Sequence, residues 1–371
     1  TMIVVTLAFM LLTLMIAMTV SSTIYRPVSR LIKRVAAFNS RKSDDAAYRD
    51  EFGYLDEMYK QSVEQLDLLD KEKNRYRHFM KDYLLKKLLQ ESHAMDESTS
   101  AELVRERHLA WVMDHRLIVC VLKLDNAREF QSAFSVRQQE LIKFAILNIS
   151  TETLSASFLA AGCDMGEDHV ALAIGWGADK PYDADSLQRL LSRIQAYTLQ
   201  SYKISVTACI SRETGDFKEV STLYGEALND SAYRFVLGRM SIITPERIRA
   251  NIGNEAFGYS AELEERLLKQ MKAGRSAAFE ETLRRLFAEV SELEYNNIMI
   301  ALIRLADALK KTVDAMMKSK LHPVHFHFPA ISRKLFELET IDDYYALLVD
   351  AVSPVMETDG DEELERRNAA I

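Results

Sequence analysis

"AAGCDMGEDHVALAIGWG", which runs from Ala160 to Gly177, places a short polar turn between two apolar segments. Small and β-branched residues on either side of a glycine-containing turn are typical of a β-hairpin. The turn carries two neighbouring carboxylates, Glu167 and Asp168. Carboxylate oxygens are ligands for hard divalent cations, so this turn is a candidate site for a metal ion or a phosphate group.

The segments on both sides of the hairpin alternate between strand and helix patterns. Apolar β-branched runs predict strands, and apolar residues spaced by three and four predict amphipathic helices. In chain order the segments are a strand "RLIVCVLKLD", a helix "SVRQQELIKFAILNISTETL", the hairpin, a helix "SLQRLLSRIQAYTLQSY", a strand "KISVTACIS", a helix "EVSTLYGEALNDSAYRFVLGR" and a short strand "SIIT". This order predicts an α+β domain over residues 114–247, in which helices pack on a sheet with antiparallel pairs.

The composition limits the classes of protein that need to be considered. The 371 residues include 48% hydrophobic residues but only six prolines and twelve glycines, which favours long helices and two or three domains. The net charge of −8 does not favour a broad basic surface for nucleic acid. Cys120, Cys163 and Cys209 are widely separated, so we predict buried, reduced thiols and not a metal motif.

The first 25 residues, "TMIVVTLAFMLLTLMIAMTVSSTIY", contain no charged side chain. Such a run is long enough to cross ~30 Å of hydrocarbon, which predicts a transmembrane helix over residues 1–25. Arg26, Arg30, Lys33 and Arg34 follow it, and clustered cations favour the cytoplasmic side of a membrane. We therefore expect a single-pass protein of the cell membrane, with its N-terminus outside. A secretory signal peptide is disfavoured because the cations follow the apolar run.

A proline-led helical pattern and a polar connector follow the apolar run. Pro27 suits the first turn of a helix, and the quartet Asp50, Glu51, Phe52 and Gly53 comes after the connector. This arrangement resembles a HAMP domain over residues 26–70. The resemblance implies a parallel four-helix bundle made by two chains, which changes its packing in response to a signal. A static coiled-coil stalk is the alternative.

Apolar residues then continue at alternating spacings of three and four, as in a coiled-coil seam. We predict a parallel homodimer through Phe52 to Tyr83, and a connecting helix or coiled coil over residues 71–113. Ser62 and Lys73 interrupt the seam. His78 lacks the acidic residue and proline expected after the phospho-accepting histidine of a sensor kinase, which disfavours that reading. The predicted seam residues are Leu55, Tyr59, Leu66, Leu69, Tyr76, Met80 and Tyr83.

The order of segments in residues 114–247, together with "LYGEALNDSAYRFVLGR", resembles a GGDEF domain, the catalytic domain of diguanylate cyclases. The turn from Met165 to His169 lies where the Gly-Gly-Asp/Glu-Glu-Phe motif of that family would lie. The resemblance implies a ferredoxin- or cyclase-like α+β fold. It also implies two metal-holding carboxylates, one in the first strand and one in the turn.

The chemistry of these positions is degenerate. Lys123 stands where the first metal-holding carboxylate is expected, and an ammonium group repels a cation. Met165 replaces the first glycine, whose missing Cβ would let phosphates approach the backbone, while Gly166 and Glu167 are kept. Asp125 could restore metal binding in another register. We expect no catalysis, no cofactor and no metal, and ligand binding without turnover is the alternative.

The remaining residues, 255–371, have the pattern of a helical domain. The helical segments are "SAELEERLLKQMKAG", "SAAFEETLRRLFAEV", "NNIMIALIRLADALKKTVDAMM" and "TIDDYYALLVDAVSPVM". Gly274 is placed to end the first of them. His322, His325 and His327 do not have the spacing of a standard zinc site, so we interpret them as part of a loop.

The whole series resembles a membrane-anchored transcriptional regulator of the AraC type. That resemblance implies an outer sensor before Thr1 that binds an extracellular ligand, and a DNA-binding helix-turn-helix module after Ile371. The predicted function is then the transmembrane signal relay of such a regulator. A diguanylate cyclase-like protein or a nucleotide-binding receptor is the alternative.

Overall fold

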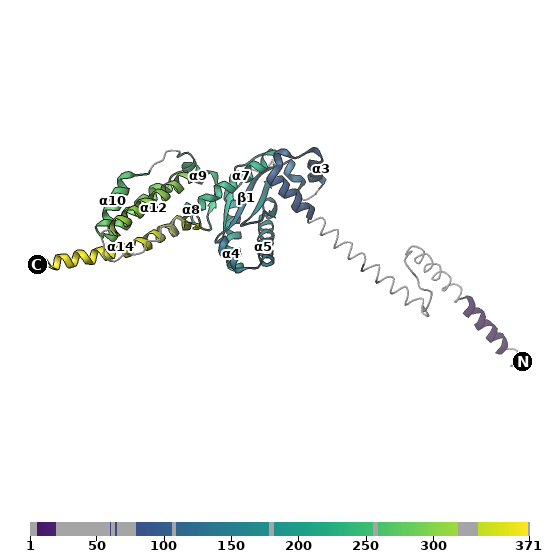
Figure 1. Cartoon of the computed structure of the whole chain (residues 1–371). Helices are drawn as coiled ribbons and strands as arrows, with labels where there is room; N and C mark the ends of the chain where they lie inside the picture. Colours follow the sequence, from purple (N-terminus) through teal and green to yellow (C-terminus); the bar gives the residue numbers. More distant parts are fainter. Residues whose placement is uncertain are drawn as a thin grey trace. The chain divides into compact units, whose positions relative to one another are not determined.

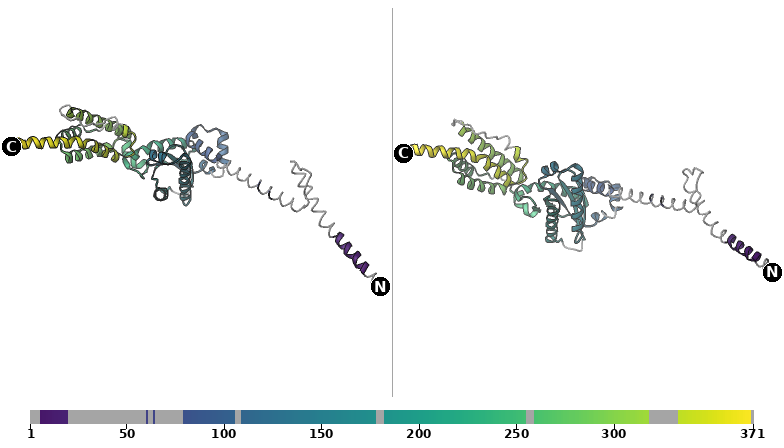
Figure 2. Two further views of the ribbon diagram at one scale, coloured as in Figure 1. Left: turned by 60° about the horizontal axis from the view of Figure 1, so that its bottom comes forward. Right: turned by 90° about the horizontal axis from the view of Figure 1, so that it is seen from below.

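The structure is a computed structural model that describes residues 6–19, 60, 64, 79–105, 109–177, 182–254, 259–317 and 333–369 (Figure 1). The chain divides into two compact units, Thr1–Phe79 and Met80–Ile371. In the first unit, the structure describes a helical segment at residues 6–19. The second unit contains the sheet and the helices that pack on it or follow it (Figure 2).

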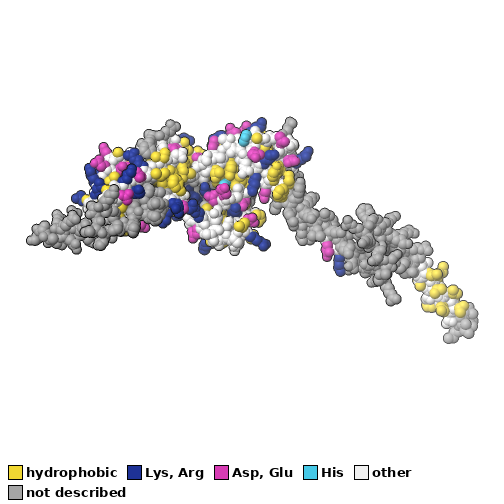
Figure 3. Space-filling model, viewed as in Figure 1, with side chains coloured by type: hydrophobic (Ala, Val, Ile, Leu, Met, Phe, Trp, Pro, Cys, Tyr) yellow, Lys and Arg dark blue, Asp and Glu magenta, His cyan; other side chains and the backbone are white. Residues whose placement is uncertain are grey.

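The helix of the first unit covers residues 6–19 and exposes large apolar side chains, including Leu7, Phe9 and Met10 (Figure 3). Within the described ranges, none of the helices combines the length and the apolar character needed to cross a membrane. This finding contradicts the predicted transmembrane helix over residues 1–25 and the single-pass membrane localisation that followed from it.

Several predicted features lie outside the described residues. They are the HAMP-like residues Pro27, Asp50, Glu51, Phe52 and Gly53, the seam residues Leu55, Tyr59, Leu66, Leu69 and Tyr76, and the histidines His78, His322, His325 and His327. The HAMP-like domain and the homodimer remain predictions from the sequence.

The second unit contains a mixed five-stranded sheet in the order β2-β3-β1-β4-β5. Its strands are β1 (Arg116–Leu124), β2 (Leu159–Asp164), β3 (His169–Trp176), β4 (Val206–Ile210) and β5 (Ile242–Ile243). Strand β1 pairs antiparallel with both β3 and β4, and β5 pairs parallel with β4. The predicted hairpin is present as β2 and β3, and the predicted α+β arrangement is confirmed.

Strand β1 is central, and its alternating side chains face two different cores. Ile118, Cys120 and Leu122 belong to one core, which is shared with α5 (Val136–Leu154) and α6 (Ala184–Tyr202). Leu117 and Val119 belong to the other core, on the opposite face of the sheet. Helices α4 (Ala127–Ala133), α7 (Val220–Asp230) and α8 (Arg234–Leu237) and the short turns η3 (Phe217–Glu219) and η4 (Ser231–Tyr233) complete this domain.

The second face of the sheet is covered in part by a helix at residues 79–91. Its buried leucines, Leu84, Leu85, Leu88 and Leu89, share a core with β1, β3 and α7. Tyr83, a predicted seam residue, is exposed on this helix, and Met80 is half-buried. The chain then continues through η1 (Ser92–Ala94), α3 (Glu97–Arg105) and η2 (Ala110–Met113) before it enters β1.

The C-terminal part is helical and has a core of its own. After α9 (Pro245–Ile252) come α10 (Ala261–Lys272), α11 (Ser276–Ser291), α12 (Tyr295–Met317) and α14 (Ile341–Ala369). Apolar residues of α10, α11, α12 and α14 form one cluster, in which Phe279, Leu302 and Tyr344 are fully buried. Gly274, with φ of 65°, follows the end of α10, as its predicted role as a helix-ending residue requires.

The three cysteines lie in the α+β domain and are free and buried, as predicted. Burial raises the pKa of the Cys120 and Cys163 thiols to about 12. These thiols are therefore protonated near neutral pH and are poor metal ligands or nucleophiles.

Candidate functional site

The β2–β3 turn is tight and is held by its own side chains. Gly166 has φ of 88° and Glu167 has φ of 34°, so both residues adopt left-handed backbone conformations. The Asp164 carboxylate accepts a hydrogen bond from the Gly166 backbone N–H at 2.9 Å. The Glu167 side chain is exposed. The turn carboxylate named from the sequence therefore projects toward solvent.

Lys123 reaches the same turn from β1. It lies opposite His169 in the β1–β3 register, and its Nζ is 3.4 Å from Asp168 Oδ2. Both side chains are about four-fifths buried, with 22% and 23% of their surface exposed. Burial raises the pKa of Asp168, but the hydrogen bond from His169 and the charge of Lys123 outweigh it, and the pKa is lowered overall. The first expected metal position thus holds a cation that already has its carboxylate partner.

His169 connects the turn to α7. Its Nδ1 lies 3.2 Å from Asp168 Oδ1, and its Nε2 lies 2.8 Å from the Tyr224 hydroxyl. The His169 side chain is almost fully buried. Burial raises the pKa of Tyr224, so its hydroxyl stays protonated near neutral pH. Sequence reasoning placed His169 at the end of the turn without a role and did not place Tyr224 in the site, because only the packing of α7 brings the two side chains together.

Met165 and Lys143 fill the space beside the turn. Met165 packs against the core that contains Leu85 and Leu223, and its Sδ lies 3.5 Å from Cys163 Sγ. Lys143, from α5, is buried and lies 2.9 Å from both carboxylate oxygens of Asp164. Two lysines therefore neutralise two carboxylates at a turn where a metal–phosphate site would need free carboxylates and open backbone.

Asp125, which the sequence left open as a substitute metal ligand, is committed elsewhere. Its side chain is fully buried, and Oδ1 accepts hydrogen bonds from Thr207 at 2.8 Å and Arg234 at 3.0 Å. Its Oδ2 accepts from the Met240 backbone N–H at 3.1 Å. The residues that the structure describes include no group of three or more His, Cys, Asp or Glu side chains arranged to hold a metal ion.

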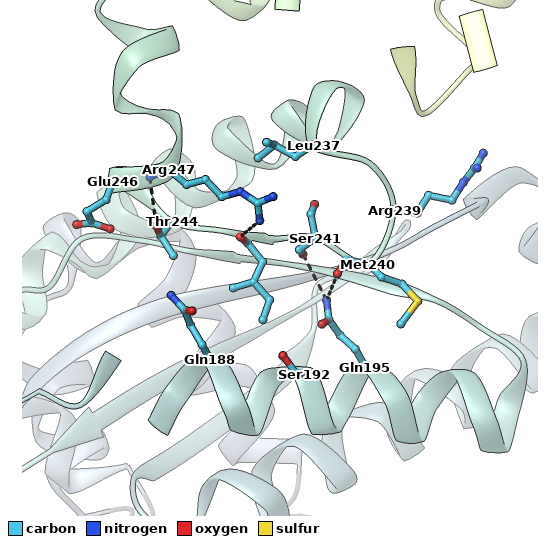
Figure 4. A pocket seen from close by; sticks show the side chains of 11 residues that line it. Gln188, Ser192, Gln195, Leu237, Arg239, Met240, Ser241, Thr244, Glu246 and Arg247 are labelled. Carbon is cyan, nitrogen blue, oxygen red and sulfur yellow. Dashed lines mark hydrogen bonds between the residues drawn. The ribbon is translucent and has the colours of Figure 1, made fainter. Parts of the chain in front are cut away.

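A separate pocket lies between α6, the loop before β5 and the start of α9, with a volume of about 670 Å³ (Figure 4). Its lining includes Gln188 and Ser192 of α6, together with Ser241, Thr244 and Arg247. The Arg247 guanidinium donates to the Ile242 carbonyl at 2.9 Å. Among the described residues, the buried Ser241 hydroxyl has no hydrogen-bond partner. The pocket is polar and contains one unsatisfied hydroxyl group.

Comparisons with known proteins give a match to a solved structure. No protein-family model matches the chain, and no curated protein matches its sequence. The chain is similar to the diguanylate cyclase SiaD, solved in complex with its activator SiaC from Pseudomonas aeruginosa, at 13% identity and a TM-score of 0.29. The match covers 62% of this chain and 89% of that chain.

The predicted identity as an AraC-type regulator is corrected by these findings. Neither the comparisons nor the described helices support a transcription regulator, a membrane anchor, a DNA partner or an extracellular ligand. What the structure supports of this identification is the α+β domain with its mixed five-stranded sheet.

Proposed function

We propose that this chain is a non-catalytic, cyclase-like relay protein. Its α+β domain would couple the helix at residues 79–91, packed on one face of the sheet, to the C-terminal helices. The observation that carries the proposal is the ion pair between Lys123 and Asp168, with Nζ and Oδ2 3.4 Å apart. A cation fixed at the first metal position and a carboxylate already neutralised would both oppose binding of a divalent ion.

Hydrogen bonds that connect the helix at residues 79–91 to the β2–β3 turn through α7 support the proposed coupling. Ser92, immediately after the helix at residues 79–91, donates to the Lys218 carbonyl at 2.7 Å and accepts from the Ser221 backbone N–H at 2.8 Å. Tyr224, one turn further along α7, contacts His169 in the β2–β3 turn. A movement of the helix at residues 79–91 would therefore reach the β2–β3 turn through α7.

The test is an assay of the purified chain with GTP and Mg²⁺, followed by chromatography of the nucleotides. An authentic diguanylate cyclase serves as the positive control. We expect no cyclic dinucleotide and no loss of GTP. Formation of a cyclic dinucleotide that disappears in a Glu167→Gln variant would show that the turn is catalytic and that the proposal is wrong.

Ligand binding without turnover is a second candidate, which the pocket in Figure 4 favours. The amide of Gln188 and the guanidinium of Arg247 line this pocket and are groups that can bind phosphates and base edges. Calorimetry with GTP and with a cyclic dinucleotide tests this candidate. Binding at this pocket predicts heat that Arg247→Ala removes and Arg249→Ala keeps, because Arg249 is exposed on the same helix and does not line the pocket.

A further inference from the structure

Glu339, which precedes α14, lies against the end of β1 in the α+β domain. Its carboxylate accepts hydrogen bonds from two consecutive backbone N–H groups, those of Asn126 at 2.6 Å and Ala127 at 3.3 Å. Two guanidinium groups also approach it, with Arg234 Nη2 3.4 Å from Oε1 and Arg239 Nε 3.6 Å from Oε2. One carboxylate from the C-terminal part thus accepts two backbone hydrogen bonds from the α+β domain and forms ion pairs with two of its guanidinium groups, of which Arg239 donates its Nε hydrogen bond to Asn126 Oδ1 at 3.0 Å.

The contact belongs to a chain of alternating charges. Arg234 lies between Asp125 and Glu339, and Arg239 lies between Glu339 and Asp343, with Nη2 2.7 Å from Asp343 Oδ2. Asp125, Arg234 and Glu339 have side-chain exposures of 0%, 10% and 15%. Charges removed from water to this degree interact strongly, and removal of one member leaves its neighbours with fewer partners of opposite charge.

Glu339 is also placed to control the start of α14. The next residue, Thr340, is buried, and its hydroxyl accepts from the Asp343 backbone N–H at 3.2 Å. Residues of α14 such as Tyr344 and Leu348 belong to the core of the C-terminal helices. A change at Glu339 would therefore act on the first turn of a helix that packs into that core.

A neighbouring ion pair gives an internal comparison. Glu337, two residues earlier, pairs with Arg128 across the same junction at 2.9 Å, but 67% of the Arg128 side chain and 34% of the Glu337 side chain are exposed. Exposed pairs of this kind contribute little to stability. Glu339 and Glu337 therefore form a matched pair of carboxylates at the junction, of which Glu339 is the more buried.

We infer that Glu339 is a conformational latch. It holds the C-terminal helices against the end of β1, and its release is the step through which the α+β domain changes their position. This inference rests on the proposed relay function and names its switching contact. The latch is discrete because Glu339 either reaches the two N–H groups and the two guanidinium groups or loses all four, so a two-state equilibrium is expected.

The test uses the full chain with spin labels at Arg137→Cys in α5 and Arg285→Cys in α11, both exposed positions. The native cysteines are buried, so the labels react at the introduced positions. The distance between the two labels is measured by pulsed electron–electron double resonance, and Glu339→Ala is compared with the matched control Glu337→Ala. We expect a second, longer distance in the Glu339 variant and an unchanged distribution in the control.

Hydrogen exchange provides a second readout on the same variants. The Asn126 and Ala127 amides that bond to Glu339 should exchange about tenfold faster or more in Glu339→Ala, and at the wild-type rate in Glu337→Ala. Equal exchange and equal distances in all three proteins would overturn the latch, and so would equal broadening in both variants. If Glu339→Ala loses its circular dichroism spectrum, Glu339→Gln replaces it, because the amide keeps the shape and one acceptor.

The two proposals can fail separately. Failure of the latch appears in distances and exchange rates, which do not depend on nucleotide chemistry. Failure of the non-catalytic assignment appears as product in the GTP assay, which does not depend on the position of α14.

Discussion

Replacement of Asp125 by alanine measures how much the buried hydrogen bonds and ion pair at the end of β1 contribute to the free energy of unfolding. Asp125 has no exposed side-chain surface and accepts from Thr207, Arg234 and the Met240 backbone N–H. Removal of one member of a buried ion pair costs about 3–5 kcal/mol, because the other charge stays buried without it. Arg234 would keep the Leu124 carbonyl at 2.9 Å and Glu339, so we expect the lower end, about 3 kcal/mol.

The assay is urea unfolding followed by tryptophan fluorescence. The chain has two tryptophans, Trp111 in η2 and Trp176 in β3, so the signal reports the α+β domain alone. Asp125→Asn keeps an acceptor and should cost less than the alanine variant. Asp185→Ala is the control, since this exposed carboxylate in the first turn of α6 should contribute well under about 1 kcal/mol. A loss below about 1 kcal/mol for Asp125→Ala would refute the assignment of Asp125 to a buried structural network.

Three further predictions address packing, pH dependence and assembly. Gly175→Ala would place a Cβ 2.3 Å from the Trp111 ring, so we expect a loss of about 1–3 kcal/mol and a shifted emission maximum in urea unfolding. Burial and then the charge of Glu226 raise the pKa of Asp230 from 3.8 to about 6, so its ionisation costs stability as the pH rises from about 4 through 6. Because this carboxylate is only about half-buried, solvent screening reduces the effect, and Asp230→Asn should stabilise the protein by about 1 kcal/mol at pH 8 and have little effect at pH 4, as compared by thermal unfolding. The predicted parallel homodimer requires that Leu66→Cys form an interchain disulfide under mild oxidation; a monomer on non-reducing gels would contradict it.

Strong periodic patterns made much of the α+β domain predictable from the sequence. The β-branched run of β1 and the polar turn between β2 and β3 each carry a local signal that needs no tertiary information. The N-terminal segment shows the limit of the same reasoning. Its lack of charge predicted a membrane span, whereas the described helix covers only residues 6–19.

The candidate site was predictable only in part, because its chemistry depends on contacts between distant segments. The sequence identified Lys123 as a cation in place of a carboxylate, but the partner at Asp168 follows from the β1–β3 register. Asp125 could not be assigned, since Arg234 lies 109 residues away in the chain. Glu339 gave no signal at all, because a single carboxylate before a helix is common and its four partners come from other segments.

At the end of β1, both charged side chains already have partners of opposite charge. Lys123 and Asp125 are separated by one residue, and each now has a partner of opposite charge, Asp168 in the turn and Arg234 in α8. A divalent ion at this place would have to displace both cations, and Arg234 is shared with Glu339. Lys123→Asp alone would restore one carboxylate but would leave Asp125 bound to Arg234 and Met165 packed beside the turn. Arg234, which opposes metal binding at Asp125, also pairs with Glu339 just before α14, so freeing Asp125 for a divalent ion would disturb the contact that we propose as the latch.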